Sequence, residues 1–85
     1  MFKVVIHKDV IKDLEKLKQA KLVEKAKQLV EDLKIDPYNS PVEKLKGNLK
    51  GFYSKRINIQ HRLVYSIDDE NKIVSIVSMW SHYGD

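Results

Sequence analysis

Two stretches of the sequence carry apolar residues at the spacing of a helix. In the first, which opens at Asp9, the residues Val10, Leu14 and Leu17 recur at positions i, i+4 and i+7. The second stretch presents a single apolar stripe, made of Leu22, Val23, Ala26, Leu29, Val30 and Leu33. Pro37 ends the second stretch, because the residue before a proline is disfavoured in the helical conformation. The pattern predicts two antiparallel helices joined by a short turn.

Four other stretches are rich in β-branched and aromatic residues, which is typical of strands. They are Phe2–Ile6, Phe52–Ile57, Arg62–Ile67 and Lys72–Trp80. Segments of hairpin-loop length separate the last three, so we expect these to form an antiparallel meander. The order strand, helix, helix and three-strand meander predicts an α+β fold, with both helices packed on one face of a small sheet.

Alternation along the predicted strand Arg62–Ile67 separates two faces of the sheet. One face receives Leu63, Tyr65 and Ile67, and the other receives Arg62, Val64 and Ser66. We therefore expect Arg62 to point away from the helices. In Phe52–Ile57 neither set of alternate residues is clearly apolar, so the pattern leaves open whether Lys55 or Arg56 faces Arg62.

Composition bounds the class of protein. The 85 residues, 42% of them hydrophobic, suffice for one domain over residues 1–85 with a small core. No apolar run reaches the ~20 residues of a membrane span, and the first apolar segment is too short for a secretory signal. The sequence contains no cysteine, which excludes a disulfide framework and a thiolate metal site. We expect a cytoplasmic protein with no membrane partner.

Positive charge is concentrated in the middle of the sequence. The net charge is +4, but up to Asp36 nine lysines are interleaved with seven acidic residues, as on a solvated helix. From Glu43 to Arg62, Glu43 is the only acid. The basic residues of that stretch are Lys44, Lys46, Lys50, Lys55, Arg56 and Arg62. A basic stretch around a single carboxylate points weakly to nucleic acid.

The sequence carries no motif of a metal-dependent or triad-type hydrolase. It has no glycine-rich phosphate loop, no nucleophile elbow and no pair of histidines at metal-ligand spacing. What remains is Glu43, the basic residues and the pair His82 and Tyr83 after the last strand. RNA brings its own nucleophile, the 2′-OH beside each phosphodiester, so a carboxylate, cationic groups and an imidazole can suffice for cleavage. We expect no metal and no cofactor.

Four short motifs resemble one known family. They are PVEKLKGNL at residues 41–49, GFYSKRI at 51–57, HRLVY at 61–65 and the final His82-Tyr83. The set resembles the Txe/YoeB branch of the RelE toxin superfamily, and length and element order agree over nearly the whole chain. Members of that family are toxins of type II toxin–antitoxin pairs that enter the ribosomal A site and cut mRNA. The resemblance implies a RelE-like fold and an mRNA interferase that inhibits translation.

The resemblance also implies a role for each matching residue. Glu43 would be the general base and His82 the general acid. Arg62 would clamp the scissile phosphate, and Tyr83 would position or stack on the RNA. Supporting contacts to RNA would come from Lys46, Lys55 and Arg56. Lys55 stands where the family often has arginine, and lysine lacks the bidentate fork of a guanidinium.

Two other functions stay open at this point. The chain could be a non-catalytic toxin like the ParE relatives that inhibit DNA gyrase, although such chains generally lack the set Glu43, Arg62 and His82. It could also be a plain basic RNA-binding module. His61, next to Arg62, is a reserve candidate for the acid. The expected partners are a cognate antitoxin protein, mRNA and the ribosome, and family precedent allows a homodimer.

Overall fold

The computed structural model describes residues 1–39 and 41–82, with residue 82 described in its backbone only. Two helices and five strands follow one another along the chain, with short 3-10 turns at Lys8–Val10 and Gly47–Leu49. The elements are β1 (Lys3–Ile6), α1 (Ile11–Gln19), α2 (Val23–Ile35), β2 (Glu43–Lys44), β3 (Phe52–Arg56), β4 (His61–Asp68) and β5 (Ile73–His82). The α+β class predicted from the sequence is confirmed. Among the described residues, no helix is long and apolar enough to cross a membrane.

The strands form one mixed sheet in the order β1-β5-β4-β3-β2. Neighbours β2 to β5 pair antiparallel, which confirms the predicted meander, and β1 pairs parallel to β5. The sequence did not predict β2, which is two residues long and joins the free edge of β3. Two residues cannot show an alternation of apolar and polar side chains, so β2 leaves no periodic signal in the sequence.

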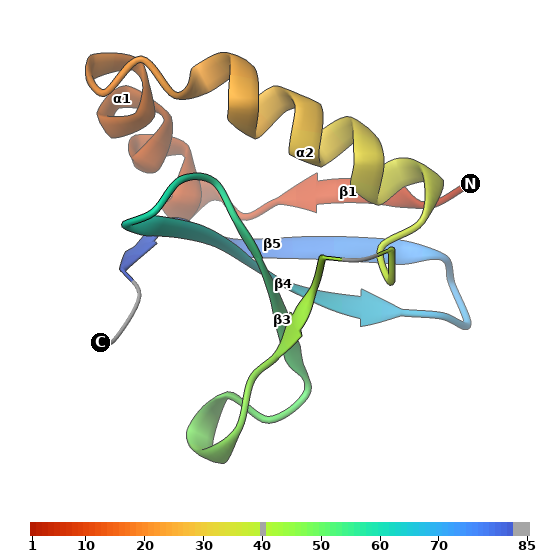
Figure 1. Ribbon diagram of the computed structural model, residues 1–85. Helices are drawn as coiled ribbons and strands as arrows, with labels where there is room; N and C mark the ends of the chain where they lie inside the picture. Colours follow the sequence, from red (N-terminus) through yellow and green to blue (C-terminus); the bar gives the residue numbers. More distant parts are fainter. Residues whose placement is uncertain (40, 83–85) are drawn as a thin grey trace.

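Both helices cover the same face of the sheet, as Figure 1 shows. The predicted helical stripes supply the buried Val10, Leu17, Ala26 and Leu33, and the sheet supplies the residues that meet them. The buried sheet residues of this core are Ile57, Leu63, Tyr65, Val74, Ile76 and Met79. Leu63 and Tyr65 therefore face the helices as predicted, and Ile67 packs against the same core.

The turn between the helices has the geometry of a Schellman motif. Lys21 takes a left-handed conformation with φ 61°. Its N–H donates to the carbonyl of Lys18 at 3.1 Å, and the N–H of Leu22 donates to the carbonyl of Leu17 at 2.8 Å. These bonds satisfy carbonyl groups that the end of α1 leaves without helical partners. The motif turns the chain so that α2 begins at Val23 and crosses the same sheet face.

Strand β5 is irregular where it approaches its end. Its register with β4 shifts on both sides of Val64. At each of these two positions β5 contains one residue more than the matching part of β4. In this region the N–H of Met79 donates to Oδ2 of Asp13 on α1, at 3.1 Å. The carboxylate thus accepts from a strand N–H at the irregularity and ties α1 to the part of β5 that leads to residue 82.

We predict that Asp13→Ala lowers the free energy of unfolding by about 1–3 kcal/mol, because the partly buried N–H of Met79 then loses its acceptor. Asp13→Asn keeps an acceptor oxygen at the same position, so we expect a smaller loss of unfolding free energy. Urea denaturation of the three proteins measures the difference. Equal stability of the alanine variant and the unmodified protein would contradict this role.

Two hydrogen bonds hold the segment between α2 and β2 against strand β4 and the turn that follows it. The buried hydroxyl of Tyr65 donates to the carbonyl of Pro37 at 2.7 Å, and burial raises the pKa of Tyr65. The hydroxyl of Tyr38 donates to the carboxylate of Asp69, and this hydrogen bond raises the pKa of Tyr38 to about 12. These bonds hold the beginning of the segment that leads from α2 to Glu43.

Candidate active site

The strand register gathers charged residues on the sheet face away from the helices. Glu43 on β2 is the partner of Ser54 on β3, and Arg56 on β3 is the partner of Arg62 on β4. Cross-strand partners share a face, and so do residues two apart in a strand. Leu63 faces the helices, so these four residues face away from them. The structure therefore confirms the predicted direction of Arg62, and it places Arg56 rather than Lys55 opposite it.

Glu43 and Arg56 line one hollow at the edge of the sheet. The hollow has a volume of about 290 Å³. Its lining residues are Pro41, Val42, Glu43, Ser54 and Arg56. Glu43 and Arg56 are exposed, whereas Ser54 is buried at the base of the same wall. A carboxylate and a guanidinium are thus presented side by side to a molecule that enters the hollow.

Arg62 is the buried cation of this face. Arg62 is 8% exposed, and the Nε–H of its side chain donates to Oγ of Ser81 at 3.4 Å. Arg56 and Arg62 are direct cross-strand partners, so two guanidinium groups lie on the same face of the sheet. Guanidinium groups bind phosphate through charge-assisted hydrogen bonds. The Arg56–Arg62 pair is therefore a candidate phosphate site.

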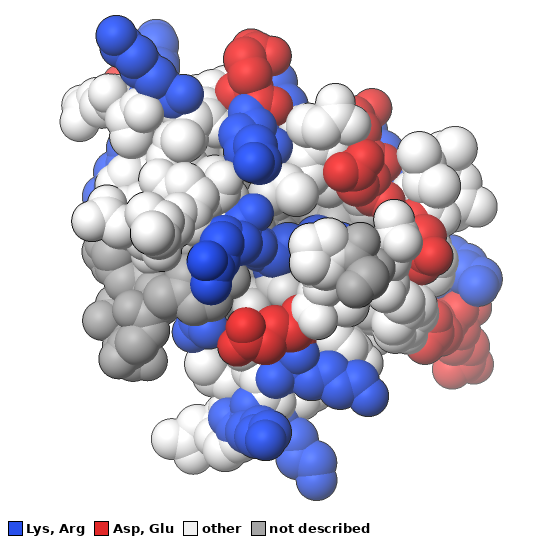
Figure 2. Space-filling view, in the orientation of Figure 1, with Lys and Arg blue, Asp and Glu red and all other residues white. Residues whose placement is uncertain are grey.

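A second, more basic hollow lies on the connection from β2 to β3. Its volume is about 400 Å³. Its lining residues are Lys44, Leu45, Lys46, Gly47, Lys50, Gly51, Phe52 and Tyr53. Gly47 and Gly51 both have positive φ, at 66° and 97°, which lets the chain fold back tightly here. In Figure 2, basic side chains surround a small acidic patch in the lower half of this face. Lys46, predicted to contact RNA, lies in this basic region.

Lys55 lies on the opposite side of β3 from Arg56. The residue is 5% exposed, and its ammonium group donates to the carbonyl oxygens of Asn39 at 2.5 Å and Pro41 at 3.3 Å. This position corrects the expectation that Lys55 contacts RNA. The ammonium faces the helix side of the sheet and is bonded within the protein, because the register pairs Lys55 with the core residue Leu63.

The end of β5 brings the chain back to Arg62. Ser81 is the partner of Arg62, and the backbone of His82 is paired with His61. The side chain of His82 and the whole of Tyr83 lie outside the described residues. The structure thus brings the backbone of the predicted acid to the strand end that carries Arg62, and the roles of His82 and Tyr83 remain predictions.

His61, the reserve candidate for the acid, is buried. It is 5% exposed and stacks on Trp80, with ring centroids 3.8 Å apart and an interplanar angle of 17°. Trp80 in turn packs against the hydrophobic core. This is the position of a packing residue, and we leave His61 out of the candidate site.

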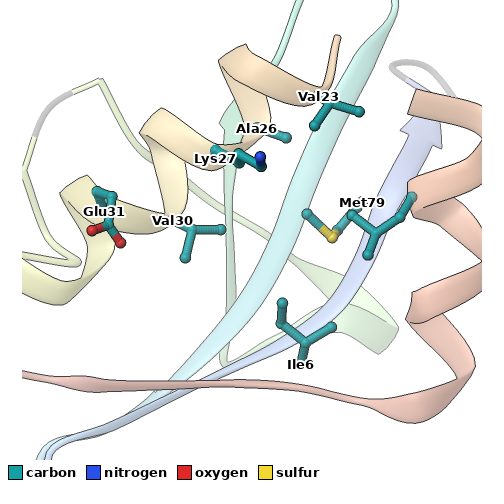
Figure 3. Close-up of a pocket in the computed structure, with 8 residues that line it drawn as sticks. Ile6, Val23, Ala26, Lys27, Val30, Glu31 and Met79 are labelled. Carbon is teal, nitrogen blue, oxygen red and sulfur yellow. The ribbon is translucent and has the colours of Figure 1, made fainter. Parts of the chain in front are cut away.

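An apolar pocket of about 370 Å³ lies on the helix side of the molecule, away from these charges. Val23, Ala26 and Val30 of α2 face Met79 and Ile6 across it, as Figure 3 shows. None of the predicted site residues whose side chains the structure describes lines this pocket. Among the described residues, no group of three or more His, Asp or Glu could hold a metal ion. The charged sheet face therefore remains the candidate site.

Comparison with known proteins assigns the chain to a family. Residues 7–83 match the model of the YoeB-like toxins of bacterial type II toxin–antitoxin systems. Toxin YoeB of Synechocystis is 40% identical over 65 residues, which cover 74% of this chain and 73% of that protein.

Two solved structures are similar over nearly the full length. The YoeB/ParE toxin of Agrobacterium tumefaciens has a TM-score of 0.84 at 29% identity, covering 96% of this chain and 100% of that one. The toxin of the Staphylococcus aureus YoeB–YefM complex, also solved as a YoeB dimer, has a TM-score of 0.76 at 33% identity, covering 98% and 99% of the two chains. From these matches and the fold, the chain belongs to the YoeB-like toxins of bacterial type II toxin–antitoxin systems.

Proposed function

We propose that this toxin is a ribosome-dependent endoribonuclease that cleaves mRNA in the A site and thereby inhibits translation. One observation supports the proposal most: Glu43 shares a sheet face and a hollow with Arg56, which is paired directly with the buried Arg62. This arrangement presents a proton acceptor next to two phosphate-binding groups. Cleavage of RNA through its own 2′-OH requires both.

The reaction would proceed by transfer of the phosphoryl group within the RNA. Glu43 takes the proton of the 2′-OH, and the 2′-oxygen forms a bond to the adjacent phosphorus. The bond from phosphorus to the 5′-oxygen breaks, and His82 gives that oxygen a proton. The products are a 2′,3′-cyclic phosphate and a free 5′-OH. No metal ion takes part in these proposed steps.

Four side chains would hold the RNA during this step. Arg62 and Arg56 would bind the scissile phosphate, where negative charge increases in the transition state. Lys46 would contact a neighbouring phosphate, and Tyr83 would position or stack on the RNA. The charge of the basic face would draw the protein to ribosomal RNA as well. Lys55 has no place in this set, because its ammonium group is bonded within the protein.

We propose an antitoxin protein as the partner that controls the activity. The S. aureus relative assembles with YefM and also forms a dimer. An antitoxin segment rich in acidic residues would cover the basic face of this chain and compete with RNA for it, in the cytoplasm where ribosomes are found. A homodimer is a second proposed assembly.

The test of this function is cleavage of mRNA on programmed ribosomes. We expect the purified protein to cut mRNA in the A site and to leave a cyclic or 3′-terminal phosphate and a 5′-OH, mapped by primer extension and by end-specific ligation. Free mRNA without ribosomes should be cut far more slowly, since the ribosome would supply the alignment.

One outcome of this assay, and one outcome of a separate assay of DNA gyrase, would contradict the proposal. Binding to ribosomes with intact mRNA would indicate a plain RNA-binding module. Inhibition of DNA gyrase supercoiling without any effect on translation would indicate a ParE-like toxin. The A. tumefaciens relative is named a YoeB/ParE toxin, so this alternative is worth testing.

A further inference from the structure

Ser54 is a buried hydroxyl at the centre of the candidate site. The residue is 1% exposed, and among the described residues its Oγ has no hydrogen-bond partner. It lies between Glu43, its partner across the strands, and Arg56, two residues along β3 on the same face. It also lines the hollow that these two charged residues share. Ser54 lies within the GFYSKRI motif at residues 51–57, but the sequence analysis assigned it no role.

An unpartnered buried hydroxyl has a cost in folding that the neighbouring polar groups of this protein avoid. The buried hydroxyl of Tyr65 donates to Pro37, and the buried ammonium of Lys55 donates to two carbonyl groups. Ser54 therefore differs from these two polar groups on the helix side of the sheet. Unsatisfied polar groups that a native structure retains call for an explanation, and a ligand that enters the hollow supplies one.

We propose that Ser54 is a substrate-binding residue, whose hydroxyl donates a hydrogen bond to a non-bridging phosphate oxygen of RNA held in the hollow between Glu43 and Arg56. This inference rests on the proposed function, because it takes RNA as the ligand. A serine hydroxyl is a neutral and directional donor, so it adds orientation where Arg56 adds charge.

The chemistry of the hollow also fixes which way a nucleotide lies in it. A phosphate is repelled by the carboxylate of Glu43 and attracted by the guanidinium of Arg56. A ribose 2′-OH, by contrast, can donate to Glu43. With Ser54 between the two, the phosphate lies toward Arg56 and the 2′-OH toward Glu43, which is the orientation that the proposed reaction requires.

The test uses Ser54→Ala in the full chain, with Ser66→Ala as the matched control. Ser66 lies on the same face of the sheet but does not line the hollow. We expect Ser54→Ala to have an equal or higher melting temperature, because it removes an unpartnered buried hydroxyl. Cleavage of ribosome-bound mRNA should fall about tenfold, the factor of one neutral hydrogen bond. The control should keep the activity.

A second measurement separates this inference from the proposed function. Adenosine 3′-monophosphate serves as a probe of the hollow without ribosomes, and its affinity is measured by calorimetry. We expect Ser54→Ala to weaken this binding about tenfold as well. Serine-dependent nucleotide binding by a protein that leaves ribosomal mRNA intact would support Ser54 and contradict the nuclease.

Two results would overturn the inference. The first is a lower melting temperature of Ser54→Ala with unchanged cleavage, which would assign the hydroxyl a structural role. The second is an affinity for the nucleotide that is equal in both proteins, or absent from both.

Discussion

Ribosome-bound mRNA is expected to be cleaved about 10²- to 10⁴-fold more slowly by Glu43→Gln than by the unmodified toxin, the range of one general acid or base group. Glutamine keeps the shape of the side chain and one acceptor oxygen but cannot take the proton of the 2′-OH. Glu43 is exposed on a two-residue edge strand, so the melting temperature should change little. Single-turnover cleavage, with the toxin in saturating excess over the programmed ribosomes, measures the rate apart from ribosome binding.

The control for this variant is Glu15→Gln, which makes the same change of charge on an exposed position of α1. Its cleavage rate should match that of the unmodified protein. A rate of Glu43→Gln equal to that of the control would remove Glu43 from the mechanism. The arginines and the alignment of the RNA would then account for the catalysis.

Most of the fold could be predicted because its elements are long enough to repeat a pattern. The stripe from Leu22 to Leu33 covers three turns of α2, and all six of its members lie in the core or against it. The alternation from Leu63 to Ile67 correctly assigned the two faces of β4. In both cases the buried face has a single partner, so periodicity alone decides which side chains turn inward.

The features that escaped prediction depend on contacts between distant residues. The strand β2 exists because Glu43 and Lys44 meet the free edge of β3, which no local pattern encodes. The irregular part of β5 is held by Asp13, far away in the sequence. A carboxylate that accepts from a strand N–H looks like any other charged residue on a helix until the fold brings the two together.

For the candidate site, too, local patterns predicted some features and others required the three-dimensional structure. The direction of Arg62 followed from the alternation in its own strand. The choice between Lys55 and Arg56 required the register with β4, and the unpartnered hydroxyl of Ser54 required the packing around it. Residue types thus suggested which chemistry to look for, and the register decided which members of the basic stretch face the same hollow as Glu43.

The corrected position of Lys55 leads to a prediction about stability. Its ammonium group joins β3 to the segment before β2 by bonding the carbonyl oxygens of Asn39 and Pro41. We expect Lys55→Met to lower the free energy of unfolding by roughly 2–4 kcal/mol, since two carbonyl groups lose a charged donor in a buried place. This is a large part of the 5–15 kcal/mol that is usual for a folded domain. Urea denaturation measures the loss.

The same variant should also slow the cleavage of mRNA at temperatures where the protein is still folded, because the released segment carries Glu43. The matched control is Lys50→Met, an exposed lysine of the neighbouring basic hollow, which should leave stability unchanged. Unaltered stability of Lys55→Met together with weaker RNA binding would contradict a structural role. It would restore the RNA contact that the sequence had suggested. A lower unfolding free energy with normal ribosome binding would instead assign Lys55 the role of holding the segment that carries Glu43 in place.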